Sequence, residues 1–336
     1  MSNSITLERP RRSGRSPFYP KGRQLEEKAA DQIRELLGNR PRRRDLLIEY
    51  LHLIQDNYNQ LSAAHLAALA SEMKLAMTEV YEVATFYHHF DVVKEGETAP
   101  PALTIRVCDG ITCEMMGAVS LLEELAAHYG TGSDVRIVHA PCVGACDRAP
   151  VAVVGKRQIY RADMANVAKA ADAGDTSADL PNYIDLDSSQ ANGGYAVWNE
   201  CRNGERNRED VIDAVDKSGL RGLGGAGFPT ARKWGFLKGT PKPRLVAINA
   251  DEGEPGTFKD RYCFETDPHR VLEGILIAAW AVEAEAAYIY LRDEYPQCRD
   301  LLLTEIARLE AENMTGGISL HLRRGAGSYI CGEESA

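Results

Sequence analysis

Two short stretches decide the fold of this chain, VCDGITC at residues 107–113 and APCVGAC at residues 140–146. Each begins at the end of a run of residues that is typical of a β-strand. Four residues separate the cysteines of the first pair, and three separate those of the second. Loops at the same ends of neighbouring strands would bring all four thiols to one site. The four residues concerned are Cys108, Cys113, Cys142 and Cys146.

Four thiolates are the ligand set of a 2Fe–2S cluster, which takes two thiolates per iron and has a wider span than a single metal ion. Structural zinc usually takes its paired cysteines from tighter knuckles with two intervening residues. The small loops between the cysteines contain glycine, which lets backbone N–H groups turn toward the sulfurs and stabilise the reduced cluster. The sequence therefore predicts a 2Fe–2S cluster, with a zinc site or four buried structural thiols as the alternatives.

The segments around these loops predict a thioredoxin-like domain over residues 97–173, in the order strand, helix, strand, hairpin and helix. The hairpin is VAVVGKRQIY at residues 151–160, which turns at a Gly-Lys pair. Before this domain, residues 24–96 space their apolar side chains by three and four, which predicts a small helical bundle. Residues 1–23 have no apolar periodicity and are predicted to be a disordered basic tail.

After the thioredoxin-like domain, residues 174–196 are polar and rich in Gly, Pro and Ser, which predicts a linker. A second α/β pattern then occupies residues 197–336. It contains the glycine loop RGLGGAG at residues 221–227, which follows a helix and therefore fails the strand context of a Rossmann fingerprint. Four glycines nevertheless allow the backbone to approach a flat or phosphorylated ligand closely. Thr230 is predicted to cap the next helix, and Lys233 to offer a charge to a phosphate.

Polar residues also gather after two predicted strands of this second pattern. INADEGEPGTFKDR occupies residues 248–261, and GAGSYICGEESA occupies residues 325–336. The carboxyl ends of strands are the edge at which ligands bind in open α/β sheets. A ligand site at this edge is therefore the prediction, and a solvated acidic loop is the alternative.

These motifs together resemble two known subunits. Residues 45–170, with EVATFYHHF and the two cysteine stretches, resemble the thioredoxin-like 2Fe–2S subunit of respiratory complex I. GLRGLGGAGFPTARKWGF, NADEGEPGTFKDR and YICGEESA, within residues 205–336, resemble the NADH-binding flavoprotein subunit of complex I. That family is shared with NAD-reducing hydrogenases and NAD-dependent formate dehydrogenases. The resemblance implies that the four cysteines ligate the cluster.

The resemblance also implies two sets of cofactor-binding residues and no catalytic acid or base, because hydride transfer to a flavin needs neither. The residues implied to bind FMN are Gly222, Gly224, Gly225, Gly227, Lys233, Asn249, Asp251, Tyr329, Gly332 and Glu333. Those implied to contact NAD(H) are Phe228, Phe236, Glu254 and Glu334.

The flavoprotein family continues beyond its YICGEES motif, with a helical region in which four cysteines bind a 4Fe–4S cluster. The present sequence has no Cys-x-x-Cys-x-x-Cys motif. We therefore expect a fragment of a longer fused polypeptide or, alternatively, a broken gene product, with the 4Fe–4S cluster only in the missing part. The expected fold is α/β, with a helical bundle and a thioredoxin-like 2Fe–2S domain followed by an incomplete α/β FMN/NAD-binding domain.

The expected function is an NADH/NAD⁺ diaphorase module that passes electrons between NAD(H), FMN and iron–sulfur clusters in a multi-subunit oxidoreductase. An NAD-dependent formate dehydrogenase is favoured, with a complex I module or a hydrogenase diaphorase as alternatives. The partner would be an iron–sulfur/molybdenum or hydrogenase-type catalytic subunit. Two rivals of another class are a non-catalytic 2Fe–2S relay or assembly subunit and a zinc-stabilised adaptor.

Net charge, apolar runs and cysteine content exclude several classes of protein. A formal net charge of −10 argues against a general nucleic-acid binder. The longest apolar run, ILIAAWAV at residues 275–282, is far shorter than the roughly 20 residues that cross a bilayer, so no membrane insertion is expected. Eight cysteines without an export signal argue against disulfides and favour the cytoplasm. Cys201, Cys263 and Cys298 are predicted to be packing residues.

Overall fold

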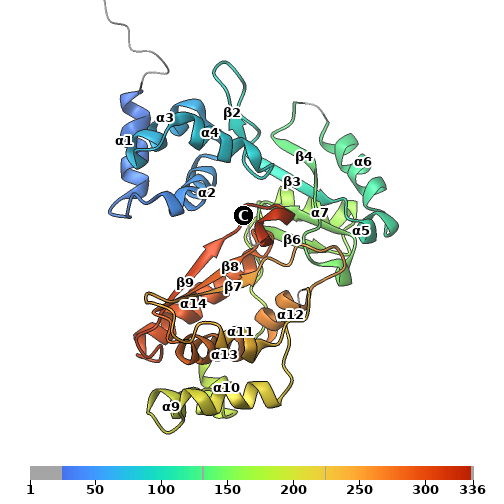
Figure 1. Ribbon diagram of the computed structural model, residues 1–336. Coiled ribbons are helices and arrows are strands. Elements are labelled where there is room, and N and C mark those ends of the chain that lie inside the picture. The colour runs from blue at the N-terminus through green and yellow to red at the C-terminus, as the bar shows by residue number, and fades with distance from the viewer. Residues whose placement is uncertain (1–24, 131, 224, 334–336) are drawn as a thin grey trace, which may run out of the picture.

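The computed structural model describes residues 25–130, 132–223 and 225–333. They form a helical bundle (residues 25–96), a thioredoxin-like region (residues 97–173) and a C-terminal region (residues 174–333). Figure 1 shows the bundle and the thioredoxin-like region next to each other above the C-terminal region. The tail predicted for residues 1–23 lies outside the described residues.

The helical bundle is built from amphipathic helices whose apolar faces meet in one core. Its elements are α1 (Glu27–Leu37), η1 (Arg44–Leu46), α2 (Leu47–Tyr58), α3 (Ala63–Met73) and α4 (Met77–Phe86), with a short parallel pair, β1 (Leu61–Ser62) and β2 (Val92–Val93). Ser62 caps α3, because its side chain accepts a hydrogen bond from the backbone N–H of His65. Ala326 and Cys331 of the C-terminal region also belong to this core, so the bundle packs directly against that region.

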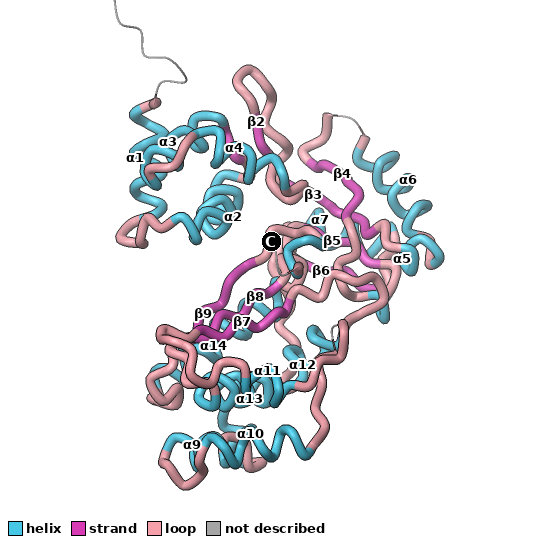
Figure 2. The backbone as a smooth tube through the Cα atoms, viewed as in Figure 1, coloured by secondary structure: helices cyan, strands magenta, loops and turns pink. Residues whose placement is uncertain are grey.

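The thioredoxin-like region has the predicted order of elements, with its helices against one four-stranded sheet (Figure 2). Its elements are β3 (Leu103–Cys108), α5 (Ile111–Met115), α6 (Ala118–Tyr129), β4 (Val135–Ala140), η2 (Cys146–Arg148), β5 (Val151–Val154), β6 (Arg157–Tyr160) and α7 (Met164–Asp172). The strand order is β4-β3-β5-β6. Because β3 and β4 are parallel and pair Cys108 with Ala140, both cysteine loops leave the same edge of the sheet.

The C-terminal region carries a three-stranded, fully parallel sheet in the order β7-β8-β9. Its elements are α8 (Leu186–Ala191), α9 (Ala196–Arg202), α10 (Arg208–Lys217), α11 (Thr230–Gly235), β7 (Leu245–Ala250), α12 (Lys259–Thr266), α13 (Pro268–Ala281), β8 (Ala286–Leu291), α14 (Pro296–Ala311), β9 (Ser319–Arg324) and η3 (Tyr329–Gly332). Parallel strands of this kind need crossover helices, which α13 and α14 provide. All three strands therefore end at one edge.

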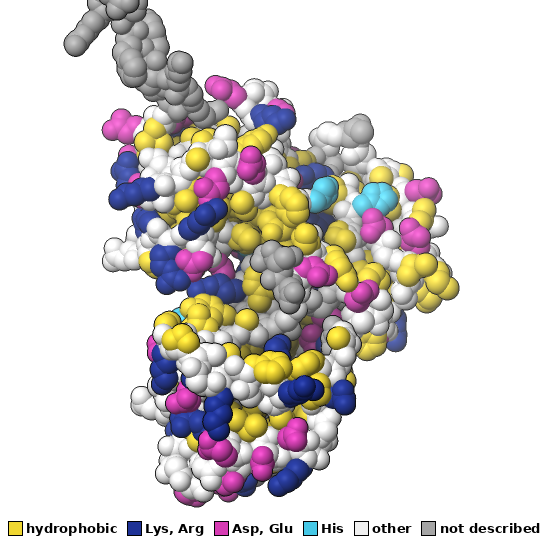
Figure 3. Space-filling model, viewed as in Figure 1, with side chains coloured by type: hydrophobic (Ala, Val, Ile, Leu, Met, Phe, Trp, Pro, Cys, Tyr) yellow, Lys and Arg dark blue, Asp and Glu magenta, His cyan; other side chains and the backbone are white. Residues whose placement is uncertain are grey.

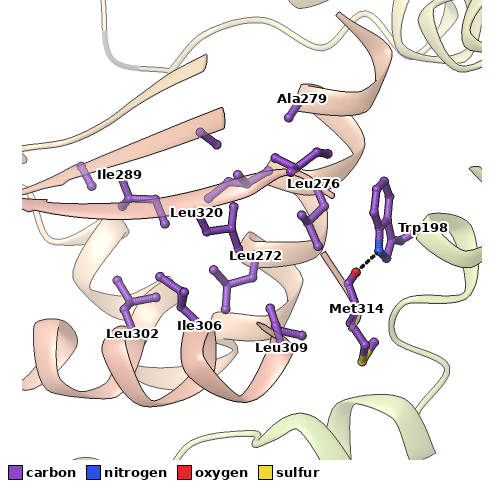
Figure 4. Packing of buried hydrophobic residues seen from close by; sticks show 14 of the residues in the cluster. Trp198, Leu272, Leu276, Ala279, Ile289, Leu302, Ile306, Leu309, Met314 and Leu320 are labelled. Carbon is purple, nitrogen blue, oxygen red and sulfur yellow. Dashed lines mark hydrogen bonds between the residues drawn. The ribbon is translucent and has the colours of Figure 1, made fainter. Parts of the chain in front are cut away.

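Helix α13 shows why this core forms where it does. Asp267 caps its start by accepting a hydrogen bond from the Arg270 N–H, and Pro268 occupies the first helical position. Buried apolar residues then recur at helical spacing and pack between the sheet and α14, as Figure 4 shows. The fully buried indole of Trp198 closes the core by donating from Nε1 to the Met314 carbonyl at 2.6 Å.

The prediction of a linker over residues 174–196 is wrong for its second half. Helix α8 lies inside that stretch, and Leu186 and Tyr195 are fully buried in the core of the C-terminal region. Asp185 caps α8 by accepting from the Ser188 N–H. The polar composition concealed this because the stretch buries only single apolar residues, without a helical run of them.

The described residues contain no helix that is both long enough and apolar enough to span a membrane.

Candidate functional site

The four predicted cluster ligands come together at the edge of the thioredoxin-like sheet. Cys108 ends β3, Cys113 lies in α5, Cys142 follows β4 and Cys146 begins η2. The first three are buried, and Cys146 is partly exposed. The Sγ atoms of Cys142 and Cys146 are 3.4 Å apart, and Cys113 and Cys142 lie close enough to Cys108 to shift the pKa of its thiol.

The mutual contacts of these thiols fit a multiply charged metal cluster. The hydrogen bond with Cys113 raises the pKa of Cys108 to about 11, and the contact with Cys108 raises the pKa of Cys142. Burial raises the pKa of Cys146. Four thiolates can coexist at such distances only when positive charge lies among them, which the irons of a cluster supply. The sulfurs also form no compact group of three donors within 4.8 Å of one another, as a single ion would favour.

Backbone N–H groups point at the sulfurs, as the glycines of the loops predict. Gly110 and Val143 donate toward Cys108, and Gly144 donates toward Cys142. One donor comes from outside the thioredoxin-like region: the N–H of Gly256 donates to the Cys146 Sγ at 3.2 Å. Gly256 belongs to the acidic stretch after β7, so a loop of the C-terminal region completes the surroundings of the quartet.

Two arginines of the C-terminal region, which the sequence analysis missed, also hold the second cysteine loop. Arg292 Nη2 donates to the Cys142 carbonyl at 2.5 Å, and Arg261 Nε donates to the Gly144 carbonyl at 3.0 Å. Both side chains are almost fully buried, with exposures of 4% and 1%. Gly144 itself has φ +69° and lies against the ring of Tyr295, where a Cβ would overlap the phenol oxygen. The position of Arg292 directly after a strand was the one feature of the sequence that could have indicated its role. The carbonyls that the two arginines bind lie more than a hundred residues away in the sequence.

The predicted flavin residues of the C-terminal region lie at the carboxyl edge of its sheet. Asn249 Nδ2 donates to the Gly332 carbonyl at 2.8 Å, and Asn249 Oδ1 accepts from the Asp251 N–H at 3.1 Å. The hydroxyl of Tyr329 donates to Glu254 Oε1 at 3.0 Å. The structure therefore brings the acidic stretch after β7 together with the segment after β9, as expected.

The backbone is crowded at this edge, which explains two of its glycines. A Cβ on Gly332 would come within 3.0 Å of the Asp251 carbonyl oxygen, and one on Gly253 within 3.2 Å of the Tyr329 ring. Burial, and secondly the charge of Glu294, raise the pKa of Asp251 to about 7. A carboxyl group that is half protonated near neutral pH can either donate to or accept from a polar ring edge.

The glycine loop forms an exposed turn between α10 and α11. The Gly222 N–H donates to the Phe228 carbonyl at 3.1 Å, and Arg221 Nη1 donates to the Gly227 carbonyl at 3.0 Å. No Cβ placed on Gly225 would meet an atom within 4 Å, so its surroundings are open. No hydrogen bond joins the described residues of this loop to the sheet edge.

The positions next to the glycine loop agree with the prediction only in part. The Thr230 cap is wrong, because Pro229 occupies the cap position and Thr230 is already the first residue of the short α11. Lys233 is exposed and has no ion pair within the part of the chain that the structure describes. The exposed rings of Phe228 and Phe236 do face each other, with centroids 5.8 Å apart. Of the remaining predicted residues, Glu333 is exposed, while Gly224 and Glu334 lie outside the described residues.

Residues of the helical bundle pack directly against the segment after β9. His52 Nε2 lies 2.7 Å from the Gly325 carbonyl, and a Cβ on Gly327 would come within 3.2 Å of the His89 Cβ. Cys331 is buried against the bundle core. The motif EVATFYHHF therefore packs beneath the predicted flavin segment and makes no direct contribution to the quartet.

His52, His89 and Asp293 form one compact group of possible metal donors, with ligand atoms all within 4.8 Å. Both carboxylate oxygens of Asp293 are engaged, one with His89 Nδ1 at 3.0 Å and the other with Arg324 Nε. A guanidinium in direct contact with the carboxylate opposes a cation there. We therefore interpret the group as an ion-pair network between the bundle and the C-terminal region.

The three cysteines predicted to be packing residues differ from one another. Cys201 and Cys298 are buried in the core of the C-terminal region, as predicted. Cys263 is exposed on α12, so that prediction is wrong. Helix α12 was not anticipated, and only one face of it is covered.

Two protein families match this chain, one for each half. Residues 33–173 match the family of thioredoxin-like [2Fe-2S] ferredoxins, and residues 215–336 match the Nuo51 FMN-binding domain. The first match contains the cysteine quartet. The second contains the glycine loop and both polar stretches at the sheet edge.

Curated relatives match one half of the chain or both. The chain is 44% identical over 167 residues to a subunit of the NADH-quinone oxidoreductase of Aquifex aeolicus, a match that covers 47% of this chain and 39% of the relative. It is 29% identical over 333 residues to NAD-reducing hydrogenase HoxS subunit alpha of Cupriavidus necator, covering 87% of this chain and 54% of the relative. The chain thus spans about half the length, or less, of these relatives.

A solved structure shows the same arrangement. The air-oxidized NAD⁺-reducing [NiFe]-hydrogenase contains a chain that superimposes with a TM-score of 0.72 at 30% identity. The superposition covers 86% of this chain and 53% of that one. Both halves and their connection therefore occur in one known polypeptide.

Proposed function

We propose that this chain, which belongs to the family of iron–sulfur and FMN-binding subunits shared by complex I and NAD-reducing hydrogenases, passes electrons between NAD(H), FMN and a 2Fe–2S cluster. One observation carries the proposal. The loop at the predicted nucleotide site is the loop that donates a hydrogen bond to the cysteine quartet, from the Gly256 N–H to the Cys146 Sγ. Two redox sites in direct contact suit electron transfer between them.

The cluster would be held by Cys108, Cys113, Cys142 and Cys146. Their thiols are mostly buried, and backbone N–H groups surround them, including that of Gly256. Such donors stabilise the more negative, reduced cluster, while burial keeps water from the sulfurs.

FMN and the nucleotide would lie at the carboxyl edge of the parallel sheet. When bound, FMN supplies the ability to accept the two electrons of a hydride and to release them singly. The proposed FMN residues are Gly222, Gly224, Gly225, Gly227, Lys233, Asn249, Asp251, Tyr329, Gly332 and Glu333. The proposed NAD(H) residues are Phe228, Phe236, Glu254 and Glu334. The exposed aromatic pair would stack on the adenine, and the exposed ammonium of Lys233 would bind a phosphate.

The residues at this edge position and orient their ligands, and we nominate none as an acid or base. Asn249 is fixed by hydrogen bonds to both polar stretches, so its amide is oriented before a ligand arrives. The crowded backbone at Gly253 and Gly332 leaves no room for a side chain at these two positions.

The larger assembly would be a cytoplasmic NAD-dependent formate dehydrogenase, with an NAD-reducing hydrogenase as the second candidate. Fusion of the two halves in one chain favours these two candidates over complex I, because the hydrogenase relative aligns over 87% of the chain while the NADH-quinone oxidoreductase relative aligns over 47%. All eight cysteines are free, which suits a reducing compartment. An iron–sulfur/molybdenum or hydrogenase-type subunit would be the partner. Formate-dependent against hydrogen-dependent reduction of NAD⁺ by the native complex distinguishes the two.

The function is tested on the full-length protein loaded with FMN and iron–sulfide. NADH should reduce ferricyanide and should produce the electron paramagnetic resonance signal of a reduced 2Fe–2S cluster. Protein that binds no FMN would overturn the enzyme proposal.

A non-catalytic 2Fe–2S relay is distinguished by the same experiment. In that case dithionite produces the cluster signal and NADH does not. Colourless protein with one bound zinc would instead identify the quartet as a structural zinc site.

A further inference from the structure

Arg292 connects the two sites more directly than any other charged side chain among the described residues. It follows β8, and its Nη2 donates to the carbonyl of the cluster ligand Cys142 at 2.5 Å. Its Nη1 donates to the carbonyl of Glu252, in the loop that also supplies Gly256. The guanidinium therefore lies between the second cysteine loop and the acidic loop.

The charge of Arg292 is paired with one carboxylate. Its Nε pairs with Glu294 Oε2 at 3.2 Å, and its other contacts are two carbonyl groups and the face of Tyr295, 5.0 Å away. With 4% of the side chain exposed, water screens this charge weakly. A buried cation next to a ligand of the cluster acts on any change of charge there.

Arg261 holds the same loop within a larger ion-pair group, whose two carboxylates also pair with Arg148. Its Nη1 and Nη2 pair with Glu265 at 2.8 Å and Asp147 at 2.5 Å, so two carboxylates surround its guanidinium. Its Nε donates to the Gly144 carbonyl. Both arginines therefore hold the second cysteine loop, and Arg292 alone also binds the acidic loop through the Glu252 carbonyl.

We propose that Arg292 is a positioning residue that sets the reduction potential of the 2Fe–2S cluster, through its charge and by holding the Gly256 N–H on Cys146. This inference rests on the proposal that the quartet holds such a cluster. Reduction adds one electron from the donor, which takes the cluster with its four thiolates from a net charge of 2− to 3−. A nearby cation stabilises the 3− form more than the 2− form, and a hydrogen bond to sulfur does the same. Both effects raise the potential.

The test is a redox titration of the cluster in the full-length holoprotein, followed by electron paramagnetic resonance with dithionite as the reductant. Arg292→Gln should move the midpoint to a more negative potential, equivalent to a roughly tenfold or greater loss in the equilibrium constant for reduction. Arg261→Gln should move it in the same direction, because loss of that guanidinium leaves the carboxylates of Asp147 and Glu265 beside the second cysteine loop.

Arg244 provides a matched control. It is also largely buried, with 11% of the side chain exposed. It donates hydrogen bonds to the carbonyls of Val282 and Thr240 and to the carboxylate of Glu283. However, it precedes β7, at the opposite edge of the same parallel sheet. Arg244→Gln should leave the midpoint at the parent value. Equal midpoints in Arg292→Gln and the parent would overturn the proposal.

Glu294→Gln keeps the test decisive if Arg292→Gln fails to hold the cluster. Removing the partly exposed carboxylate that offsets Arg292 should move the midpoint to a more positive potential, a sign that loss of packing does not explain. No shift, or a negative one, contradicts the proposal. A parent protein without any 2Fe–2S signal would instead refute the proposed function, so the two failures are distinguishable.

Discussion

The thioredoxin-like region and the C-terminal region both place their predicted ligands at the ends of parallel strands, but they finish these sites in different ways. The cysteine quartet is enclosed: three of its thiols are buried, and Gly256 and Arg292 of the other region cover its second loop. The sheet edge of the C-terminal region is open, with Asn249 and Tyr329 exposed. An enclosed site suits a cluster that stays bound. An open site suits nucleotides, which must enter and leave.

Exposed hydrophobic side chains lie near both sites. Figure 3 shows them gathered where the bundle faces the C-terminal region and at the outer end of the thioredoxin-like region. Large apolar side chains that are exposed in the structure include Phe86 of the bundle, Met115 next to the first cysteine loop, and Leu223 in the glycine loop.

Loss of a single cluster ligand is the largest effect that the comparison predicts. Cys142→Ser should reduce bound iron and sulfide at least tenfold, because a serine oxygen replaces a thiolate of the quartet. FMN binding should persist, since the open site shares no side chain with the quartet. Cys263→Ser, on an exposed cysteine, is the control and should keep the full cluster content. Retention of the cluster in Cys142→Ser would show that these thiols are structural.

A pair of glycine substitutions measures how tightly each site is built. Gly144→Ala should lower the free energy of unfolding by about 2–5 kcal/mol, since a positive φ costs about 1–2 kcal/mol and overlap with the Tyr295 ring about 1–3 kcal/mol. Gly225→Ala should change it by less than about 0.5 kcal/mol, because its surroundings are empty. Urea unfolding of both variants compares the two sites. Equal destabilisation would mean that the glycine loop is as constrained as the cluster loop.

The four ligands of the enclosed site could be predicted from the sequence because each pair of cysteines is close in sequence. The spacing of Cys108 and Cys113 and of Cys142 and Cys146, each directly after a strand, fixes both the site and the edge of the sheet on which it lies. The parallel sheet of the C-terminal region was also predictable, since apolar strands alternate with helices.

The contacts that join the two regions were not predictable from spacing. Arg261 and Arg292 donate hydrogen bonds to carbonyls 117 and 150 residues away in the sequence. Every residue has a backbone carbonyl, so residue type does not indicate which one an arginine will bind. Helix α8 was missed because only isolated residues of a polar stretch are buried. Thr230 was misplaced as a cap because Pro229 already has the extended backbone of a cap residue.

The helical bundle packs against the segment after β9 through the buried ring of His52. The pH dependence of stability tests how tightly this ring is packed. Burial lowers the pKa of His52 to about 3, so the folded chain keeps this ring neutral while the unfolded chain protonates it below about 6.5. The unfolded state then binds more protons, and stability is lost as the pH falls from 6.5 toward 3. The loss approaches about 1.4 kcal/mol per pH unit.

His52→Gln removes this titration and keeps a donor for the Gly325 carbonyl. We expect the difference in unfolding free energy between pH 7.5 and pH 5.5 to shrink by about 1 kcal/mol. His128→Gln, on the exposed face of α6, is the control and should keep the parent difference. An unchanged difference in His52→Gln would indicate that water reaches the ring and that the packing is loose.

The smallest effect concerns the open site alone. Lys233 is exposed and has no ion pair among the described residues, so Lys233→Gln should leave the unfolding midpoint unchanged. Loss of its charge should weaken FMN binding by roughly tenfold, which is the lower end of the range for a hydrogen bond to a charged group. Quenching of flavin fluorescence during titration measures the affinity. Lys238→Gln, at an exposed lysine just beyond α11 that forms a 3.9 Å ion pair with Glu209, is the matched control. If both variants bind FMN equally well, the phosphate lies elsewhere, and the glycine loop is only a turn between two helices.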